Sequence, residues 1–176
     1  MKPAIFLDRD GVLNHNEVRN GRPYAPTRLA DFIILPGVPE AVRAFREASY
    51  LVIVVTNQPD IATGKQSYPA VMAMHQLMQE QVPIDDIEIC PHTDADGCDC
   101  RKPKAGMLFN AAKKHGIALD RSWMIGDRWR DVDAGRSAGC RTVFIDYHYT
   151  AEPRPNQPDV VVGSLLEAVP FVLRKP

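Results

Sequence analysis

Two acidic residues, separated by one position, follow a short apolar run near the start of the chain. Ala4-Ile5-Phe6-Leu7 is typical of a buried strand, and Asp8-Arg9-Asp10-Gly11 follows it directly. In an open α/β sheet the ligand crevice lies beyond the carboxyl ends of the strands. Asp8 and Asp10 can point to one side of an extended chain, and Gly11 permits a turn beneath a ligand. Because adjacent carboxylates repel each other, the pair indicates a site for a divalent cation and its phosphate ligand.

A second apolar run ends in groups that can bind phosphate oxygens. Thr56, Asn57 and Gln58 offer a hydroxyl and two amides at the predicted carboxyl end of a strand. Taken alone, Thr56 also fits an ordinary strand end. The three residues become a candidate phosphate site because they share an edge of the sheet with the acid pair.

Cations and a further acid follow later in the chain. Arg101 and Lys102 precede Pro103, a residue that favours the first turn of a helix, although either cation also fits a solvated surface. Asp127 follows the apolar run 123–125, so it stands at another strand end. Asp131 fits either the site or the start of a helix.

Three cysteines and a histidine form a second candidate site. Cys90, His92, Cys98 and Cys100 supply three thiolates and an imidazole, the ligands that tetrahedral zinc prefers. Four protein ligands leave no open position for substrate, so the prediction is a structural Zn²⁺ in a loop of residues 90–100. Cys140 stands apart and is expected to be a small core thiol.

Composition limits the class of protein. The chain has 176 residues, 45% of them hydrophobic, which predicts one domain over residues 1–176. A formal net charge of −1 with mixed charges disfavours nucleic-acid and membrane partners. The sequence has no apolar stretch near the roughly 20 residues that span a bilayer, and no apparent signal peptide. We therefore expect a cytoplasmic protein, and a monomer because no interface segment stands out.

Apolar runs alternate with stretches of helical spacing. The predicted strands are residues 4–7, 51–56, 87–90, 123–125, 142–145 and 160–162, and apolar residues at helical spacing recur within 38–48, 71–78, 107–112 and 165–169. This βα alternation predicts an α/β, Rossmann-like three-layer sandwich with a mainly parallel central sheet. Residues 15–35 and 151–158 are predicted loops, and the first is expected either to border the substrate or to be a plain surface loop.

Together, these motifs resemble those of the haloacid dehalogenase superfamily of phosphatases. The resemblance rests on Asp8-Arg9-Asp10-Gly11, Thr56, Lys102 and Gly126-Asp127 with Asp131, and it covers nearly the whole chain. It implies Asp8 as nucleophile on the central strand, Asp10 as general acid and base, and Thr56 and Lys102 as ligands of the phosphoryl group. It also implies a catalytic Mg²⁺ held by Asp8, Asp127 and the backbone carbonyl of Asp10.

The Cys/His loop narrows the resemblance to two branches without a large cap domain. Residues 6–14, 101–103 and 106–108 resemble D-glycero-D-manno-heptose 1,7-bisphosphate phosphatases, which implies a small sugar phosphate as substrate. The short spacer between His92 and Cys98, and residues 66–69, resemble histidinol-phosphate phosphatases. Pro59 and Asp60 depart from the heptose pattern Asn-Gln-Ser-Gly. Carried over by position, the expected substrate contacts are Asn16, Asn57, Gln58, Arg101 and Arg128.

Two other classes of protein fit parts of the pattern. A glycosyltransferase could use Asp8 and Asp10 to hold the metal of a nucleotide sugar, but it leaves Lys102 and Asp127 without a role. A non-catalytic, zinc-stabilised binding module would need no acid pair, and both acids are present. The sequence therefore favours a phosphatase.

Overall fold

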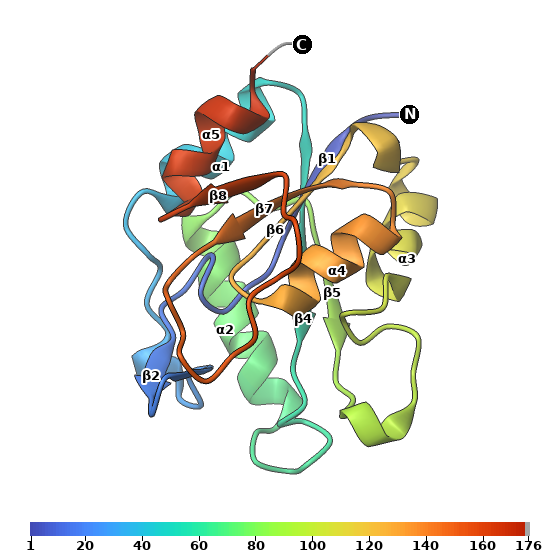
Figure 1. Ribbon diagram of the computed structural model, residues 1–176. Coiled ribbons are helices and arrows are strands. Elements are labelled where there is room, and N and C mark those ends of the chain that lie inside the picture. The colour runs from blue at the N-terminus through green and yellow to red at the C-terminus, as the bar shows by residue number, and fades with distance from the viewer. Residues whose placement is uncertain (175–176) are drawn as a thin grey trace.

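A six-stranded parallel sheet forms the centre of the molecule. The computed structural model describes residues 1–174 (Figure 1). The strands are β1 (Ala4–Leu7), β4 (Leu51–Asn57), β5 (Asp86–Cys90), β6 (Trp123–Gly126), β7 (Arg141–Ile145) and β8 (Val160–Val162). They are ordered β5-β4-β1-β6-β7-β8, and every neighbouring pair is parallel. This confirms the predicted α/β fold and places β1 inside the sheet.

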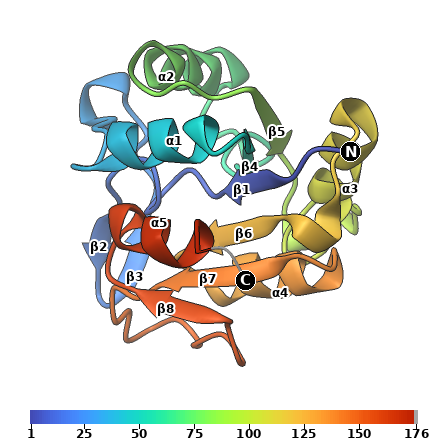
Figure 2. The ribbon, with the colours of Figure 1, turned by 90° about the horizontal axis from the view of Figure 1, so that it is seen from above.

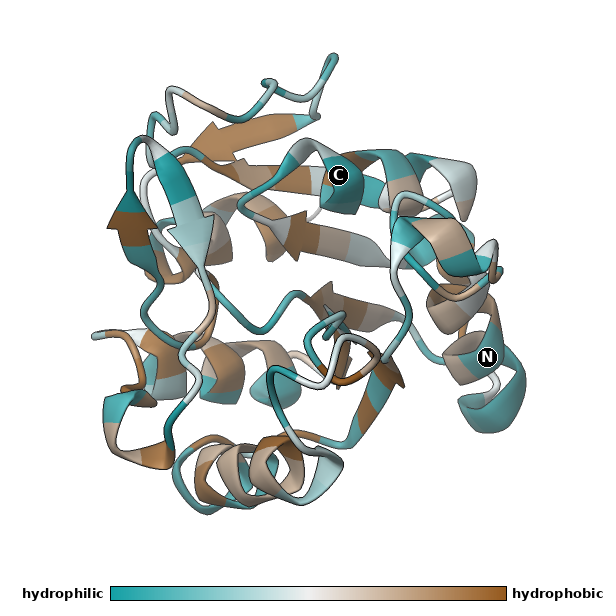
Figure 3. Ribbon diagram, turned by 90° about the horizontal axis from the view of Figure 1, so that it is seen from below, coloured by the Kyte–Doolittle hydropathy of each residue, from teal (hydrophilic) through white to brown (hydrophobic). Residues whose placement is uncertain are grey.

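Within residues 1–174, five α-helices cover the two faces of the sheet: α1 (Val38–Glu47), α2 (Tyr68–Gln81), α3 (Gly106–His115), α4 (Trp129–Ser137) and α5 (Leu165–Val172). Alternate residues of β1 serve opposite faces, as the period of a strand requires. Ile5 and Leu7 pack in one core with α1, α2 and α5, whereas Phe6 packs in another with α3 and α4. Figure 2 shows these two groups of helices on opposite sides of the sheet. In Figure 3 the hydrophobic colour concentrates on the central strands, and most connecting segments are hydrophilic.

Local signals in the sequence set the helix ends. Ser67 and Ser164 cap α2 and α5, each accepting a hydrogen bond of 3.2 Å from a backbone N–H in the first turn. Gly116 ends α3 in the left-handed conformation, with a φ of 63°. None of the helices within residues 1–174 is long and apolar enough to cross a membrane.

Residues 15–35 contain more structure than the predicted loop. A β-hairpin is formed by β2 (Glu17–Arg19) and β3 (Arg22–Tyr24), and the short 3-10 helix η1 (Leu29–Asp31) follows. Asn20 and Gly21 form the hairpin turn with φ angles of 51° and 74°, which is the pair of left-handed residues that tight hairpins favour. The other predicted loop, 151–158, is confirmed, because it holds no helix or strand.

The carboxyl ends of the strands face one edge of the molecule. In Figure 1 this is the lower side, where the hairpin, the segment after β4 and the Cys/His loop (residues 90–100) gather. The Cys/His loop begins at the end of β5 and contains the 3-10 helix η2 (Asp94–Asp96). A further 3-10 turn, η3 (Leu119–Arg121), lies at the opposite end of the sheet and precedes β6. Parallel topology thus brings chemically active segments, distant in sequence, to one edge.

Candidate active site

A cleft of about 250 Å³ opens at the carboxyl edge of the sheet. Its inner lining includes Asp8, Asp10, Lys102 and Asp131. Pro59 and Asp60 lie on the wall that follows β4. The rest of the lining comes from the hairpin and the residues beside it, from Asn57 and Gln58 at the end of β4, and from the start of α4. The cations in this part of the lining are Arg22, Arg128 and Arg130. The cleft therefore combines buried acids, one buried lysine and three arginines.

Lys102 is the centre of the buried charge network. Its Nζ donates to Asp8 Oδ1 at 2.8 Å and to the carbonyl oxygen of Val55 at 2.7 Å, and lies 2.7 Å from Asp131 Oδ1. The backbone N–H and C=O of Lys102 are both bonded to the Asn57 side-chain amide, each at 3.1 Å. Asn57, predicted to contact substrate, thus holds the backbone from which Lys102 extends.

Burial shifts the proton affinities of these groups. Burial raises the pKa of Asp8 to about 7, and the neighbouring Asp131 and Asp10 add to that rise, while Lys102 opposes it. Burial and the charge of Asp8 also raise the pKa of Asp127. For Lys102 burial acts downward, but Asp131 and Asp8 outweigh it and raise its pKa. One ammonium group is therefore surrounded by more carboxylates than it can neutralise.

Asp10 occupies a different environment from Asp8. Its carboxylate accepts hydrogen bonds from Arg9, from Asn14 Nδ2 at 3.0 Å and from Gln58 Nε2 at 2.8 Å. Burial acts to raise its pKa, but the Arg9 charge and these bonds outweigh burial and lower it. Arg9 is itself fully buried, with its guanidinium 5.5 Å from the centre of the Phe32 ring.

Thr56 lies beneath the cleft rather than in its lining. The side chain is fully buried, and its Oγ1 accepts a 2.9 Å hydrogen bond from Gln58 Nε2, the same nitrogen that donates to Asp10. The structure therefore links Thr56 to Asp10 through Gln58. Gln58 itself lines the cleft.

Three carboxylates converge where a divalent cation fits. One oxygen from each of Asp8, Asp127 and Asp131 lies within 4.8 Å of the others. Asp127 Oδ1 is buried and has no hydrogen-bond partner among residues 1–174. Hard oxygen donors, excess negative charge and an unpartnered carboxylate oxygen together suit Mg²⁺. Asp131 combines the two roles left open by the sequence, since its other oxygen accepts from the Arg128 N–H at 3.1 Å at the start of α4.

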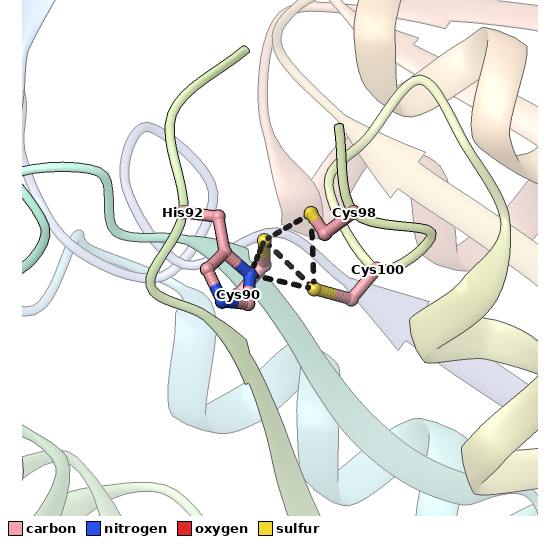
Figure 4. A group of neighbouring side chains, drawn as sticks. All are labelled: Cys90, His92, Cys98 and Cys100. Carbon is pink, nitrogen blue, oxygen red and sulfur yellow. Dashed lines mark hydrogen bonds between the residues drawn. The ribbon is translucent and has the colours of Figure 1, made fainter. Parts of the chain in front are cut away.

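The predicted zinc ligands converge in the Cys/His loop (Figure 4). His92 Nδ1 lies 3.7 Å from Cys90 Sγ and 3.3 Å from Cys100 Sγ, and the sulfur atoms are 3.0 to 3.7 Å apart. Four ligands around tetrahedral zinc, with Zn–S bonds of about 2.3 Å, stand about 3.8 Å apart. The cluster is therefore slightly more compact than a zinc site and has its donor set.

Comparison with known proteins places the chain in a family. The HAD-hydrolase-like family model matches residues 99–168. A relative from Pseudomonas aeruginosa, named D-glycero-beta-D-manno-heptose-1,7-bisphosphate 7-phosphatase, is 37% identical over 149 residues, which cover 82% of this chain and 81% of that protein. One of the same name from Vibrio cholerae is 35% identical over 182 residues, covering 96% and 92%. The chain belongs to the heptose-bisphosphate phosphatase family.

Solved structures agree with this assignment. The D,D-heptose 1,7-bisphosphate phosphatase of B. bronchiseptica, complexed with magnesium and phosphate, superimposes with a TM-score of 0.84 at 28% identity, covering 97% of this chain and 98% of that one. CbbY from Rhodobacter sphaeroides, at 17% identity and a TM-score of 0.65, shares the fold. The chain is thus a phosphatase with a haloacid dehalogenase-like fold.

In this phosphatase Arg130, to which the sequence assigned no role, lies in the cleft where Arg101 was expected. Arg101, predicted to contact substrate, turns away from the cleft, with its Nε 2.9 Å from Asp94 Oδ1 and its Nη1 bonded to the His92 carbonyl. It lines a separate surface depression beside Pro103. Arg130 lines the cleft instead and donates both to Asp94 and to the Lys102 carbonyl.

The other predicted contacts of the phosphatase lie at the cleft. Asn16 lines it, and its Nδ2 is 3.3 Å from Asp127 Oδ2. Arg128 lines it too, with its guanidinium paired to Glu152. Both side chains are therefore partly engaged within the protein.

Sequence reasoning missed four residues at or beside the site of the phosphatase: Arg22, Arg130, Asp131 as a partner of Lys102, and Tyr149. A signal existed for two of them. The Asn20-Gly21 pair indicated a hairpin that would present Arg22. Asp131 stands at a predicted helix start directly after the strand end at Asp127, and so short a connection keeps both acids at the same strand end. We find no comparable signal for Arg130 or Tyr149.

Proposed function

We propose that this phosphatase removes the 7-phosphate from D-glycero-D-manno-heptose 1,7-bisphosphate. The observation that carries the proposal is the cleft itself, in which Asp8 and Lys102 lie on the inner lining and Arg22, Arg128 and Arg130 supply further cations. A sugar with two phosphates fits these two groups of residues, with one phosphate at Asp8 and Lys102 and the other at the arginines. The names of the relatives, 35% and 37% identical, support the same substrate.

Asp8 is the proposed nucleophile. One of its carboxylate oxygens forms a bond to phosphorus as the bond from phosphorus to the sugar oxygen breaks, giving an aspartyl phosphate and a sugar alkoxide. Lys102, 2.8 Å from Asp8, is placed to offset the charge of the phosphoryl oxygens. Water then attacks the aspartyl phosphate, releasing inorganic phosphate and restoring the Asp8 carboxylate.

Asp10 is the proposed general acid and base. It donates a proton to the departing sugar oxygen and takes one from the attacking water. In the free protein burial acts to raise the pKa of Asp10, but the charge and hydrogen bonds of Arg9 outweigh burial and lower it. A bound phosphate dianion acts in the opposite direction, since a neighbouring like charge raises a carboxyl pKa.

Two metal ions complete the proposal. Asp8, Asp127 and the backbone carbonyl of Asp10 would hold Mg²⁺, with Asp131 adjacent, and Cys90, His92, Cys98 and Cys100 would hold Zn²⁺. When bound, Mg²⁺ neutralises phosphate charge and thereby allows a carboxylate to approach phosphorus. Zn²⁺ supplies no chemistry to substrate in this scheme, because its four positions are filled by protein.

The test is release of inorganic phosphate from a panel of phosphate monoesters in the presence of Mg²⁺. We expect heptose 1,7-bisphosphate to be hydrolysed, and the Asp8→Asn variant to fold and release no phosphate. Undiminished turnover by that variant would rule out Asp8 as nucleophile. Absence of phosphate release from every ester would leave the glycosyltransferase and the non-catalytic module as the explanations to examine.

The assembly and location of the protein are proposed on the sequence alone. We propose a monomer that acts in the cytoplasm on a small sugar phosphate. Sedimentation equilibrium is expected to give the mass of one 19.6 kDa chain. A stable dimer would contradict the first part of this proposal.

A further inference from the structure

The segment between β7 and β8 presents two tyrosine hydroxyls to the acid-rich edge of the sheet. Tyr149 OH donates to Asp127 Oδ2 at 2.7 Å, and Tyr147 OH donates to the Gly11 carbonyl at 2.8 Å. The two rings lie against each other, with centroids 5.7 Å apart. This segment therefore reaches both the turn after Asp10 and Asp127, the acid that directly follows β6.

The two oxygens of Asp127 have different surroundings. Oδ2 lies 2.7 Å from the Tyr149 hydroxyl and 3.3 Å from Asn16 Nδ2. Oδ1 is buried and has no protein partner within residues 1–174. Leaving a buried carboxylate oxygen without a partner is costly, so its environment fits a ligand atom that approaches a cation. The protein thus holds one oxygen and leaves the other free for the metal.

Close packing restricts rotation of the Asp127 carboxylate. Gly11 has a φ of +86°, and a Cβ built there would lie 2.1 Å from Asp127 Oδ2. The absence of a side chain at Gly11 is what allows the carboxylate to approach the turn. Asp127 is therefore enclosed by Gly11 on one side and by Asn16 and Tyr149 on others.

The segment that carries Tyr149 is anchored to its surroundings. Ala151 N–H donates to the Gly21 carbonyl of the hairpin at 3.0 Å. Glu152, with its side chain 8% exposed, pairs with Arg128 and lies 3.6 Å from Arg22 Nε. These contacts tie the residues that directly follow Tyr149 to the hairpin and to the start of α4. Tyr149 is consequently a fixed donor rather than a side chain of a free loop.

We propose that Tyr149 is a positioning residue for Mg²⁺: its hydroxyl holds Asp127 Oδ2 so that Oδ1 faces the metal. The inference rests on the proposed function, because the metal site belongs to that reaction. Hydrogen-bond partners of metal ligands contribute to affinity by fixing ligand orientation, and their removal typically costs about 10- to 100-fold. Tyr149 does not touch the reacting phosphate in this scheme.

The test compares Mg²⁺ binding by Tyr149→Phe and wild-type protein. Binding is measured without substrate, from the rise in melting temperature as MgCl₂ is added, and the Mg²⁺ dependence of turnover is measured separately. We expect roughly 10-fold or greater weakening of Mg²⁺ affinity in the variant, with kcat at saturating Mg²⁺ close to that of wild type. Tyr68→Phe, the same chemical change at an exposed site on α2, is the matched control and should bind Mg²⁺ like wild type.

A second variant guards against a folding defect. Asn16→Ala removes the other donor to Asp127 Oδ2 and is expected to weaken Mg²⁺ binding in the same direction. If Tyr149→Phe unfolds, Mg²⁺ binding by Asn16→Ala tests whether the donors to Oδ2 set the metal affinity, and an unchanged affinity would overturn the inference. Unchanged Mg²⁺ affinity in a folded Tyr149→Phe protein would overturn the inference, whatever its activity. Wild-type protein that binds Mg²⁺ but hydrolyses no phosphate ester would instead overturn the proposed function.

Discussion

At the scale of single residues, the site depends on an uneven distribution of buried charge. Lys102 contacts both Asp8 and Asp131, while Asp10 is neutralised by a separate cation, Arg9. The family resemblance implied the two roles of the acid pair, but the sequence did not show that the Arg9 side chain would bond to the Asp10 carboxylate. An extended chain places Arg9 and Asp10 on opposite sides. The bond forms because a buried guanidinium needs acceptors.

Replacing Asp10 with Asn should separate the two chemical steps. Roughly a hundred- to ten-thousand-fold loss of turnover is expected on sugar phosphates, because the leaving oxygen receives no proton. With p-nitrophenyl phosphate, whose leaving group needs no proton, rapid kinetics should show a burst of one equivalent of nitrophenol followed by slow turnover. Asp133→Asn, on α4, serves as the control. Equal impairment of burst and steady state would contradict this role.

His75 should make stability depend on pH. The side chain is 1% exposed, and burial, aided by the charge of Arg9, lowers its pKa to about 4. Its unfolded value is about 6.5, so between these values the unfolded chain binds a proton that the folded protein does not. The free energy of unfolding therefore falls as pH falls through this window. Above pH 6.5 His75 is neutral in both the folded and the unfolded state, so its titration takes nothing from the stability there.

Arg9 Nη1 lies 3.2 Å from His75 Nε2, and His75→Gln removes this titration while keeping an acceptor for Arg9. We expect the wild type to lose about 3 kcal/mol of unfolding free energy, relative to the variant, as the pH falls from 6.5 to 4. Urea unfolding at several pH values measures the difference, in which the other titrating groups cancel. A difference that does not vary with pH would show that His75 titrates normally.

At the scale of elements, the Cys/His loop connects the four proposed zinc ligands to Lys102, the proposed phosphate-binding lysine. Asp94, in η2, pairs with both Arg101 and Arg130, and Arg130 also donates to the Lys102 carbonyl at 3.3 Å. The ligand spacing predicted the cluster itself, because all four ligands lie within eleven residues. It could not predict which arginine would enter the cleft, since that depends on Asp94 and on the position of α4.

Removal of zinc should therefore reduce both stability and activity. Treatment with 1,10-phenanthroline, with Mg²⁺ in excess, is expected to lower the melting temperature by about 10 °C, as a loss of about 3 kcal/mol would do in a chain of this length. Cys100→Ser should show the same low value without chelator. Cys140→Ala, at a thiol outside the cluster, should respond to chelator like wild type. A melting temperature unaffected by chelator would argue against a structural metal.

The β2–β3 hairpin is the element that the sequence pattern missed, and it carries Arg22 to the cleft. Its strands are too short for clear alternation, and Pro23 in β3 is unfavourable in a regular strand. Arg22→Ala should raise KM for heptose 1,7-bisphosphate about tenfold, the effect of losing one charge-assisted hydrogen bond. KM for heptose 7-phosphate should change little.

Arg28→Ala is the matched control for the hairpin arginine. Arg28 is exposed and pairs with Asp31, away from the cleft lining. Its loss should leave both KM values unchanged. If Arg22→Ala raised KM equally for the bisphosphate and the monophosphate, Arg22 would not contact the second phosphate.

At the scale of the whole molecule, parallel strands explain why so much of the site was predictable. Asp8, Thr56 and Asp127 each lie at or just beyond the carboxyl end of a strand, so strand order alone brings them to one edge. Residues that depend on loop conformation were not predictable in the same way. Tyr149 reaches Asp127 from the segment after β7 because contacts with the hairpin hold that segment, and no local pattern encodes those contacts.

The central claim is that buried acids at this edge, with arginines around them, select a sugar bisphosphate. The most direct measurement is kcat/KM for both anomers of heptose 1,7-bisphosphate and for histidinol phosphate, with Mg²⁺ present. We predict a value at least about tenfold higher for one heptose anomer than for histidinol phosphate, because only the bisphosphate offers the arginines a second anion. A higher value for histidinol phosphate would contradict the account.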